Sequence, residues 1–324
     1  MPTIAAPAGP PLHTTLLASD HVRVADRIDL IPITDRARRG SVATRPRRGI
    51  VRRAEPGPHG PLVYDATQTG DRVTVSVWGP EATAPEDRAA ALEAARGWIG
   101  LHDRPPDLAD VTAGHRALHQ ATLRVGTVRL SQLPRVQEAV GRAILGQLVQ
   151  GIEARRSTAQ LAALRGTPAG GDLWSWPTAT ALGQTPAHAM RRCGISLKGA
   201  VAIHHCAVDD PQLERVRDDP GRLDRRLRAV PGVGPWTSAE TRFALGDPDA
   251  VSVGDLHLPT TVCHALAGAS GDACTDELML ELLEPYRGQR GRVIRLVVLA
   301  VGRGLLPRAR RRAPRAALSA HRYW

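Results

Sequence analysis

Asp255 is the residue whose type and position best suit a chemical reaction. It lies in the segment 246–259 (Gly-Asp-Pro-Asp-Ala-Val-Ser-Val-Gly-Asp-Leu-His-Leu-Pro), where Pro259 limits how early the next helix can begin. Asp255 therefore falls within about one turn of a helix start, where an aspartate ordinarily caps the helix. A carboxylate can also stabilise an oxocarbenium-like transition state and orient or deprotonate a water that cuts an N-glycosidic bond. The pattern leaves capping and catalysis open, and one aspartate can do both.

A turn with two glycines precedes this aspartate, inside the expected helical hairpin 222–245. The segment 227–240 has the sequence Leu-Arg-Ala-Val-Pro-Gly-Val-Gly-Pro-Trp-Thr-Ser-Ala-Glu. Gly232 and Gly234 allow the backbone to turn tightly and to approach a ligand closely. The second helix begins just after them, so its free N–H groups can bind a phosphate without reading any base. The same spacing also suits a tight connection that binds nothing.

The composition is that of a folded and strongly basic protein. The 324 residues are 42% hydrophobic, which indicates a globular chain, and they carry a formal net charge of +11. Of the 43 Lys and Arg residues, only Lys198 is a lysine, and arginine can bind two phosphate oxygens at once. Such a charge attracts polyanions, with nucleic acid as the first candidate, although a solvated basic face would give the same composition.

Metal motifs, targeting segments and membrane spans are not evident in the sequence. The four cysteines form neither a close pair nor a His/Cys cluster at metal spacing, so we expect no side-chain metal site and no iron–sulfur cluster. Residues 1–11 are rich in Ala and Pro and lack the apolar core of a signal peptide. The longest apolar stretch, 293–301, is too short to cross a bilayer. We expect a cytoplasmic monomer that associates with the nucleoid in a bacterium.

The chain divides into a strand-like part and a helical part. Residues 12–103 show strand alternation, most strictly over 72–78, and Pro85 opens a helix that runs to about residue 101. Residues 104–306 follow helical spacing, and 307–324 form a basic tail. We therefore expect an α+β protein with an antiparallel sheet and one helix, followed by an all-helical region. The expected helices lie at 136–152, 154–165, 178–190, 196–206, 221–229, 236–245, 256–267, 275–284 and 289–301.

Three segments together resemble the helix-hairpin-helix DNA glycosylases, and among them most closely the 3-methyladenine DNA glycosylase II (AlkA-like) family. The first is the hairpin 230–238 (Val-Pro-Gly-Val-Gly-Pro-Trp-Thr-Ser), with an aspartate about 20 residues on. The second, 142–150 (Arg-Ala-Ile-Leu-Gly-Gln-Leu-Val-Gln), resembles the family's helix whose Gln-Leu end reaches DNA. The third, 193–198 (Cys-Gly-Ile-Ser-Leu-Lys), resembles its Gly-x-x-x-Lys turn. The resemblance implies a TBP-like domain at 12–103 and a two-lobed helical glycosylase domain at 104–306, with the active-site cleft between the lobes.

The resemblance also implies roles for the residues that would contact DNA. Leu148, next to Gln147, would fill the space left by a flipped nucleotide. Gly232, Gly234 and Thr237 would hold a DNA phosphate, helped by a Na⁺ or K⁺ ion on backbone carbonyls of the hairpin. Considered without the family, Leu148 would equally suit an ordinary core position on an amphipathic helix.

The base pocket and the reaction follow from the same resemblance. Asp255 would be the catalytic carboxylate, and Trp236 would line the base pocket, although alone it would also suit a hydrophobic staple. Relatives that also cut the DNA backbone carry a lysine where this chain has Trp236. The resemblance therefore implies a monofunctional enzyme of base excision repair that needs no cofactor. It would remove alkylated bases of the 3-methyladenine or 7-methylguanine type from double-stranded DNA and leave an abasic site.

Two positions depart from the family pattern and keep other functions open. Relatives often carry aromatic residues near the positions of Glu240 and Gln289, where rings help to select a cationic alkylated base. Glu240 could offer a negative charge to such a base, or it could be an exposed helix carboxylate. The alternatives are a glycosylase for deaminated or oxidised bases and a catalytically silent protein that binds lesions in DNA.

Overall fold

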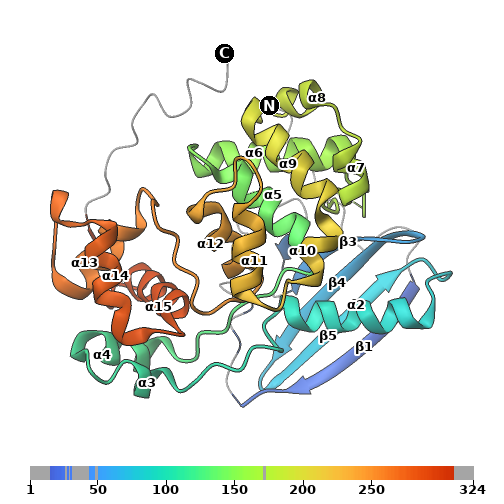
Figure 1. Cartoon of the computed structure of the whole chain (residues 1–324). Coiled ribbons are helices and arrows are strands. Elements are labelled where there is room, and N and C mark those ends of the chain that lie inside the picture. The colour runs from blue at the N-terminus through green and yellow to red at the C-terminus, as the bar shows by residue number, and fades with distance from the viewer. Residues whose placement is uncertain are drawn as a thin grey trace, which may run out of the picture.

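The protein is described by a computed structural model that covers residues 15–25, 28, 30, 44–47, 50–170 and 173–309. Its N-terminal part is one antiparallel sheet of five strands in the order β1-β5-β4-β3-β2. Figure 1 shows this sheet, in blue and cyan, beside the helices that make up the rest of the molecule. The strands are β1 (Thr15–Arg23), β2 (Thr44–Arg47), β3 (Ile50–Gly57), β4 (Gly60–Thr69) and β5 (Arg72–Gly79).

One helix, α2 (Pro85–Trp98), covers a face of the sheet. Strand β5 alternates as its sequence predicts, and Val73, Val75 and Val77 turn inward to pack with Ala95 and Trp98 of α2 in a single core. Helix α2 begins at a proline, which needs no N–H partner at the first position, and carries acidic residues in its first turn. The sheet and helix expected within 12–103 are thus confirmed.

The remaining helices form two separate hydrophobic cores. One core lies among α5–α11, and the other joins α3 and α4 with α13–α15. Figure 1 shows α3 and α4 lying beside α13, α14 and α15, although these helices are far apart in the sequence. The helices are α3 (Leu108–Val111), α4 (Arg116–Val125), α5 (Val136–Gly146), α6 (Gly151–Arg165), α7 (Ala179–Gly183), α8 (Ala187–Arg192), α9 (Leu197–Val208), α10 (Asp210–Arg215), α11 (Pro220–Arg228), α12 (Pro235–Ala244), α13 (Leu258–Ala267), α14 (Asp276–Leu283) and α15 (Arg290–Gly302).

The chain therefore crosses between the two cores twice. It contributes α3 and α4 to one core, crosses to the other at α5, and returns after α12 through the segment 245–257, which carries Asp255. In the linker that precedes α3, both carboxylate oxygens of Asp103 accept from Arg292 of α15, at 2.6 and 2.7 Å. This buried bidentate pair fixes the linker to the last helix.

A second set of buried charges joins the sheet to α5. Arg53 and Glu55 of β3 are buried against Glu138 of α5, and Arg53 forms ion pairs with both carboxylates. Arg142, one turn along α5, pairs with Glu138, and Arg135 pairs with Glu55 at 3.4 Å. The N-terminal end of α5 is thus held on the sheet by paired charges.

Most of the helices expected from the sequence are present within a few residues of the expected bounds, but two were wrong. The helix expected at 136–152 ends at Gly146, and a new helix begins at Gly151, because Leu148 adopts a left-handed conformation that an α-helix cannot continue. The helix expected at 178–190 is two short helices, α7 and α8, separated at Pro186. Of the expected tail 307–324, residues 310–324 lie outside the described residues. In the described part of the chain, every helix is too short or too polar to span a membrane.

Candidate active site

The hairpin 222–245 forms as expected, with α11, a short turn and α12. Gly232 has a φ of +88°, and a β-carbon there would lie 3.2 Å from the β-carbon of Ala202 on α9, so both conformation and space favour glycine. Gly234 caps α12, and no atom lies within 4 Å of where its β-carbon would be. The start of α12 therefore presents bare backbone, with the first N–H groups of the helix available to an anion.

Gln147 and Thr237, two of the residues expected to contact DNA, contact each other. The Gln147 side chain donates from Nε2 to Thr237 Oγ1 at 2.8 Å and to the carbonyl oxygen of Gly232 at 2.8 Å. Thr237 as a whole residue is only 2% exposed. Its hydroxyl is thus engaged inside the protein, whereas Gly234, Pro235 and Trp236 before it are at least partly exposed.

Leu148 is the most exposed of the large apolar side chains in the described residues. It is 71% exposed and has a φ of +52°, a left-handed conformation that no other described residue except glycine adopts. That conformation costs a residue with a β-carbon about 1–2 kcal/mol. Leu148 therefore lies in the loop between α5 and α6 and not in the core of an amphipathic helix, and strain of this kind tends to mark functional positions.

Asp255 is both a helix cap and a half-buried carboxylate. Its Oδ1 accepts from the backbone N–H groups of His257 and Leu258 at 2.8 and 2.9 Å, at the start of α13. Its Oδ2 accepts from Nε1 of Trp236, on α12, at 3.0 Å. Three N–H donors thus fix the carboxylate between the hairpin and α13, next to the positive end of a helix.

Trp236 bridges three elements of the site. Its indole N–H holds Asp255, and its ring packs against α5, where a β-carbon at Gly146 would lie 3.2 Å from Cη2. A larger residue at position 146 would therefore press on the ring. Trp236 thus joins the end of α5, two residues before Leu148, to the carboxylate of Asp255.

The two polar positions expected in the base pocket have different surroundings. Glu240 lies one turn after Trp236 on α12, and its Oε1 accepts from the hydroxyl of Ser252 at 2.7 Å. Gln289 caps α15, and its Oε1 accepts from Nε of Arg292 at 2.8 Å. The structure therefore connects Glu240 to the segment that carries Asp255, whereas it connects Gln289 to the buried Asp103–Arg292 pair.

Asp249 and Asp276 also position the segment 245–257, and sequence reasoning did not assign them. Asp249 Oδ1 accepts from the backbone N–H groups of Gly288 and Arg290 at 2.8 and 3.0 Å, and its carboxylate pairs with the Arg290 side chain. Burial raises the pKa of Asp249, but hydrogen bonds from Arg290 and Gly288 more than offset it and hold that pKa below its ordinary value. Asp276 accepts from the N–H of Gly254 at 2.9 Å. The signal for Asp249 was its place in the turn-forming Asp-Pro-Asp sequence.

Metal ligands from side chains do not gather anywhere in the described residues: no three His, Cys, Asp or Glu side chains lie close enough to share an ion. For a monovalent cation on the hairpin, the carbonyls of Val230 and Gly232 are candidate ligands. They accept hydrogen bonds from the Val233 N–H and from Gln147, and each retains a second lone pair. The cation stays a prediction.

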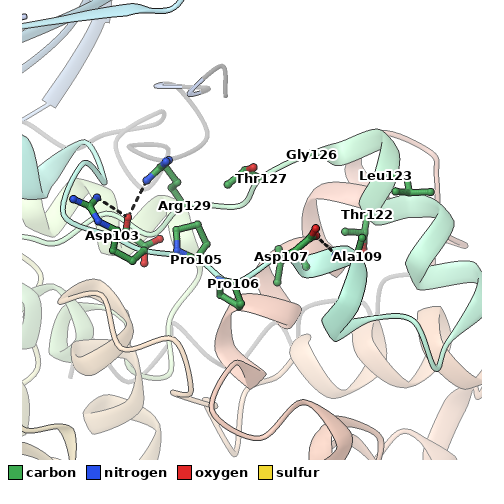
Figure 2. Close-up of a pocket in the computed structure, with 12 residues that line it drawn as sticks. Asp103, Pro105, Pro106, Asp107, Ala109, Thr122, Leu123, Gly126, Thr127 and Arg129 are labelled. Carbon is green, nitrogen blue, oxygen red and sulfur yellow. Dashed lines mark hydrogen bonds between the residues drawn. The ribbon is translucent and has the colours of Figure 1, made fainter. Parts of the chain in front are cut away.

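A hollow of about 520 Å³ lies elsewhere, between the linker that precedes α3 and the end of α4. Figure 2 shows Asp103 and Arg129 at one end of it and Thr122 and Leu123 at the other. Residues 103–109 supply one side of the lining. None of the site residues expected from the sequence lines this hollow.

Comparisons with known proteins identify the fold. No family model matches the sequence, and no curated protein matches it. Among solved structures, the 3-methyladenine DNA glycosylase from Archaeoglobus fulgidus is 18% identical with a TM-score of 0.72, over 86% of this chain and 97% of that chain. The 8-oxoguanine glycosylase/lyase of Clostridium acetobutylicum in its apo form is 13% identical with a TM-score of 0.66, over 86% and 95%. Its complex with double-stranded DNA containing cytosine opposite 8-oxoG is 13% identical with a TM-score of 0.65, over 88% and 96%. The chain has the fold of these DNA glycosylases, as the helix-hairpin-helix resemblance implied.

Proposed function

We propose that this chain is a monofunctional DNA glycosylase of the AlkA-like family that removes alkylated bases of the 3-methyladenine or 7-methylguanine type. The observation that carries the proposal is the placement of Asp255. Its carboxylate is half-buried and accepts a hydrogen bond from Trp236 on α12, the second helix of the hairpin. The fold that contains it is shared with glycosylases of damaged bases. A helix cap alone needs only Oδ1, whereas Oδ2 is held in place by a separate donor.

Each part of the site has a step in this reaction. The first N–H groups of α12 bind a phosphate of double-stranded DNA, and Leu148 enters the duplex where the damaged nucleotide leaves it. As the bond between the base and the sugar lengthens, positive charge develops on the sugar, and the carboxylate of Asp255 stabilises it. Asp255 then takes a proton from the attacking water, which leaves an abasic site and the free base. An alkylated base is already a good leaving group, so one carboxylate suffices.

The site lacks an amine where lyase chemistry would need one. A glycosylase that also cuts the backbone forms a Schiff base through an amine, and this chain has Trp236 at the hairpin position. Lys198 is the only lysine in the sequence. It lies at the start of α9, with its carbonyl oxygen 3.8 Å from where a β-carbon of Gly232 would be. We infer hydrolysis alone, by a monomer without a cofactor in the bacterial cytoplasm, associated with the nucleoid.

A second candidate is a glycosylase for deaminated or oxidised bases, and Glu240 is the observation that favours it. Its carboxylate is fixed by Ser252 one turn beyond Trp236, where it could accept hydrogen bonds from the N–H groups of a neutral base. A third candidate, a catalytically silent lesion-binding protein, accounts less well for Asp255, because a carboxylate close to DNA phosphates weakens simple binding.

The deciding experiment is release of bases from alkylated duplex DNA by the intact protein and by Asp255→Asn. We expect release by the intact protein and a loss of about 10²–10³-fold in the variant, with DNA binding retained. Trp236→Phe keeps an aromatic ring, although a smaller one, and removes the N–H. A hydrogen bond to a charged group contributes about 1.5–3 kcal/mol, so we expect a loss of about tenfold or more.

Trp78→Phe is the matched control, because the buried Nε1 of Trp78 has no hydrogen-bond partner to lose. Binding of the lesion without any release of alkylated bases would overturn the alkylation proposal. Release from a panel of deaminated and oxidised substrates would then identify the second candidate, and no release from any substrate would identify the third. A complex trapped covalently by borohydride would contradict the absence of lyase chemistry.

A further inference from the structure

Gln147 donates both N–H groups of its side-chain amide to the hairpin. Nε2 lies 2.8 Å from the carbonyl oxygen of Gly232 and 2.8 Å from Oγ1 of Thr237. A carbonyl oxygen can only accept, so the NH₂ group and not the amide oxygen must face the hairpin. The two acceptors belong to the turn and to the first turn of α12, so the end of α5 is attached to both.

We propose that Gln147 is a positioning residue that holds Leu148 in the conformation in which it enters the duplex, an inference that rests on the proposed function. Gln147 caps α5, and its carbonyl carbon forms the peptide bond to Leu148. The left-handed backbone of Leu148 is strained, and such a conformation persists only where the surroundings fix it. With Gln147 attached to the hairpin, the leucine side chain is already presented to solvent and needs no rearrangement on binding.

The same attachment places the leucine relative to the phosphate site. Gly232, whose carbonyl binds Gln147, is itself packed against Ala202 of α9, so the hairpin turn is a firm anchor. Asp255 is held independently by Trp236 and by the start of α13. Loss of the Gln147 hydrogen bonds should therefore impair extrusion of the base and leave the carboxylate in place.

The test compares a damaged base that is paired with the same base left unpaired in the duplex, where extrusion costs less. In single-turnover assays, Gln147→Met, which keeps the length of the side chain but has no amide, should slow release from the paired site by about tenfold. At the unpaired site the loss should be less than about twofold. Gln147→Glu is a second variant of the same length. It should show the same selective loss on the paired site, because it turns a carboxylate oxygen toward the carbonyl oxygen of Gly232.

A double variant separates a positioning role from a general structural one. If Gln147 acts through the leucine, then Gln147→Met combined with Leu148→Ala should be no slower on the paired site than Leu148→Ala alone. Gln184→Met is the matched control, because Gln184 also caps a helix, α7, and is exposed. It should leave both rates unchanged.

Two results would overturn the inference while the proposed function stands. One is an equal loss of release rate on paired and unpaired sites in Gln147→Met. The other is a double variant whose loss of rate equals the product of the losses in the two single variants. If the unmodified protein releases no base from any substrate, the proposed function has failed, and the inference fails with it.

Discussion

At its N-terminal end, α5 places charged side chains in the protein interior, whereas at its C-terminal end it places an apolar side chain in solvent. Glu138, in the first turn, is 0% exposed and pairs with Arg53 of the sheet. Leu148, just past the last turn, is exposed and left-handed. Both arrangements oppose folding, the first because charge is removed from water and the second because the backbone is strained.

The difference lies in where each cost is offset. Glu138 finds its partners within the chain, since Arg53 and Arg142 neutralise it and fix α5 on the sheet. Leu148 leaves 71% of its surface in solvent, and by our proposal the DNA duplex covers it. Buried charge here attaches one element to another, whereas by our proposal the exposed apolar side chain contacts the substrate.

At the N-terminal end of α5, the pKa shifts of Glu138 and Glu55 reflect the balance between burial and the neighbouring charges. Burial alone would raise the pKa of Glu138, but the guanidinium groups of Arg142 and Arg53 lower it below its ordinary value. Burial raises the pKa of Glu55, which Arg53 only partly opposes and the charge of Glu138 reinforces. The network therefore favours the charged form of Glu138 more strongly than that of Glu55.

The largest expected effect is on stability, from Glu138→Gln. This variant leaves Arg53 and Arg142 buried without their shared anion, and breaking a buried pair from one side costs about 3–5 kcal/mol. Denaturant unfolding measures the loss. Glu284→Gln is the control, because its pair with Arg287 is mostly exposed and contributes about 0–1 kcal/mol. Similar losses in the two variants would contradict the difference between buried and exposed charge.

The contribution of Glu138 should also depend on pH. Its pKa is lowered on folding, so its stabilising effect is complete above the pKa of the unfolded chain and is lost as the pH falls through the lower pKa of the folded protein. The difference in stability between the intact protein and Glu138→Gln should therefore shrink in acid.

The next prediction contrasts two leucines three residues apart. Leu145 is 1% exposed, and Leu145→Ala should cost about 2–5 kcal/mol because it leaves a cavity. Leu148→Gly should cost nothing and could stabilise the protein by up to about 1 kcal/mol, since glycine removes the left-handed strain while it adds freedom to the unfolded chain. The same variant should lose base release from paired sites. A destabilised Leu148→Gly protein would mean that the leucine is part of the core.

The sequence predicted the elements of this site better than their contacts. Gly232, with its positive φ, and the capping role of Asp255 follow from local rules of turns and helix ends, so a single sequence reveals them. The hydrogen bond from Trp236 to Asp255 joins α12 to the segment that precedes α13, and no local pattern encodes that approach. The hydrogen bond from Gln147 to Thr237 could not be predicted either, because it joins residues that are far apart in the sequence.

The wrong bounds of α5 have a particular cause. Apolar residues continue at helical spacing past Gly146, through Leu148 to Ile152, so periodicity favours one long helix. Both side chains are exposed in the structure, at 71% and 65%, so this spacing does not reflect a buried face. A hydrophobic pattern predicts burial in the protein, and it misleads where apolar side chains serve a ligand.

The smallest effect expected is on the pH dependence of stability, at Asp210 beside the N-terminal end of α5. Burial and the charge of Glu214 raise the pKa of Asp210 to about 6, against the opposing charge of Arg135. A raised carboxyl pKa contributes stability that is complete below the unfolded value and is lost as the pH rises through about 6. Asp210→Asn should therefore gain stability over the intact protein between about pH 4 and 7, by about 1 kcal/mol once screening by solvent is allowed for.

Urea unfolding at a series of pH values measures this gain. Asp218→Asn is the control, because its side chain is 97% exposed and its charge should make little difference. Parallel stability curves for the intact protein and Asp210→Asn would contradict the prediction. A gain that grows through pH 6 would show that a carboxylate next to α5 is tolerated only where a guanidinium meets it, as one meets Glu138 and none fully meets Asp210.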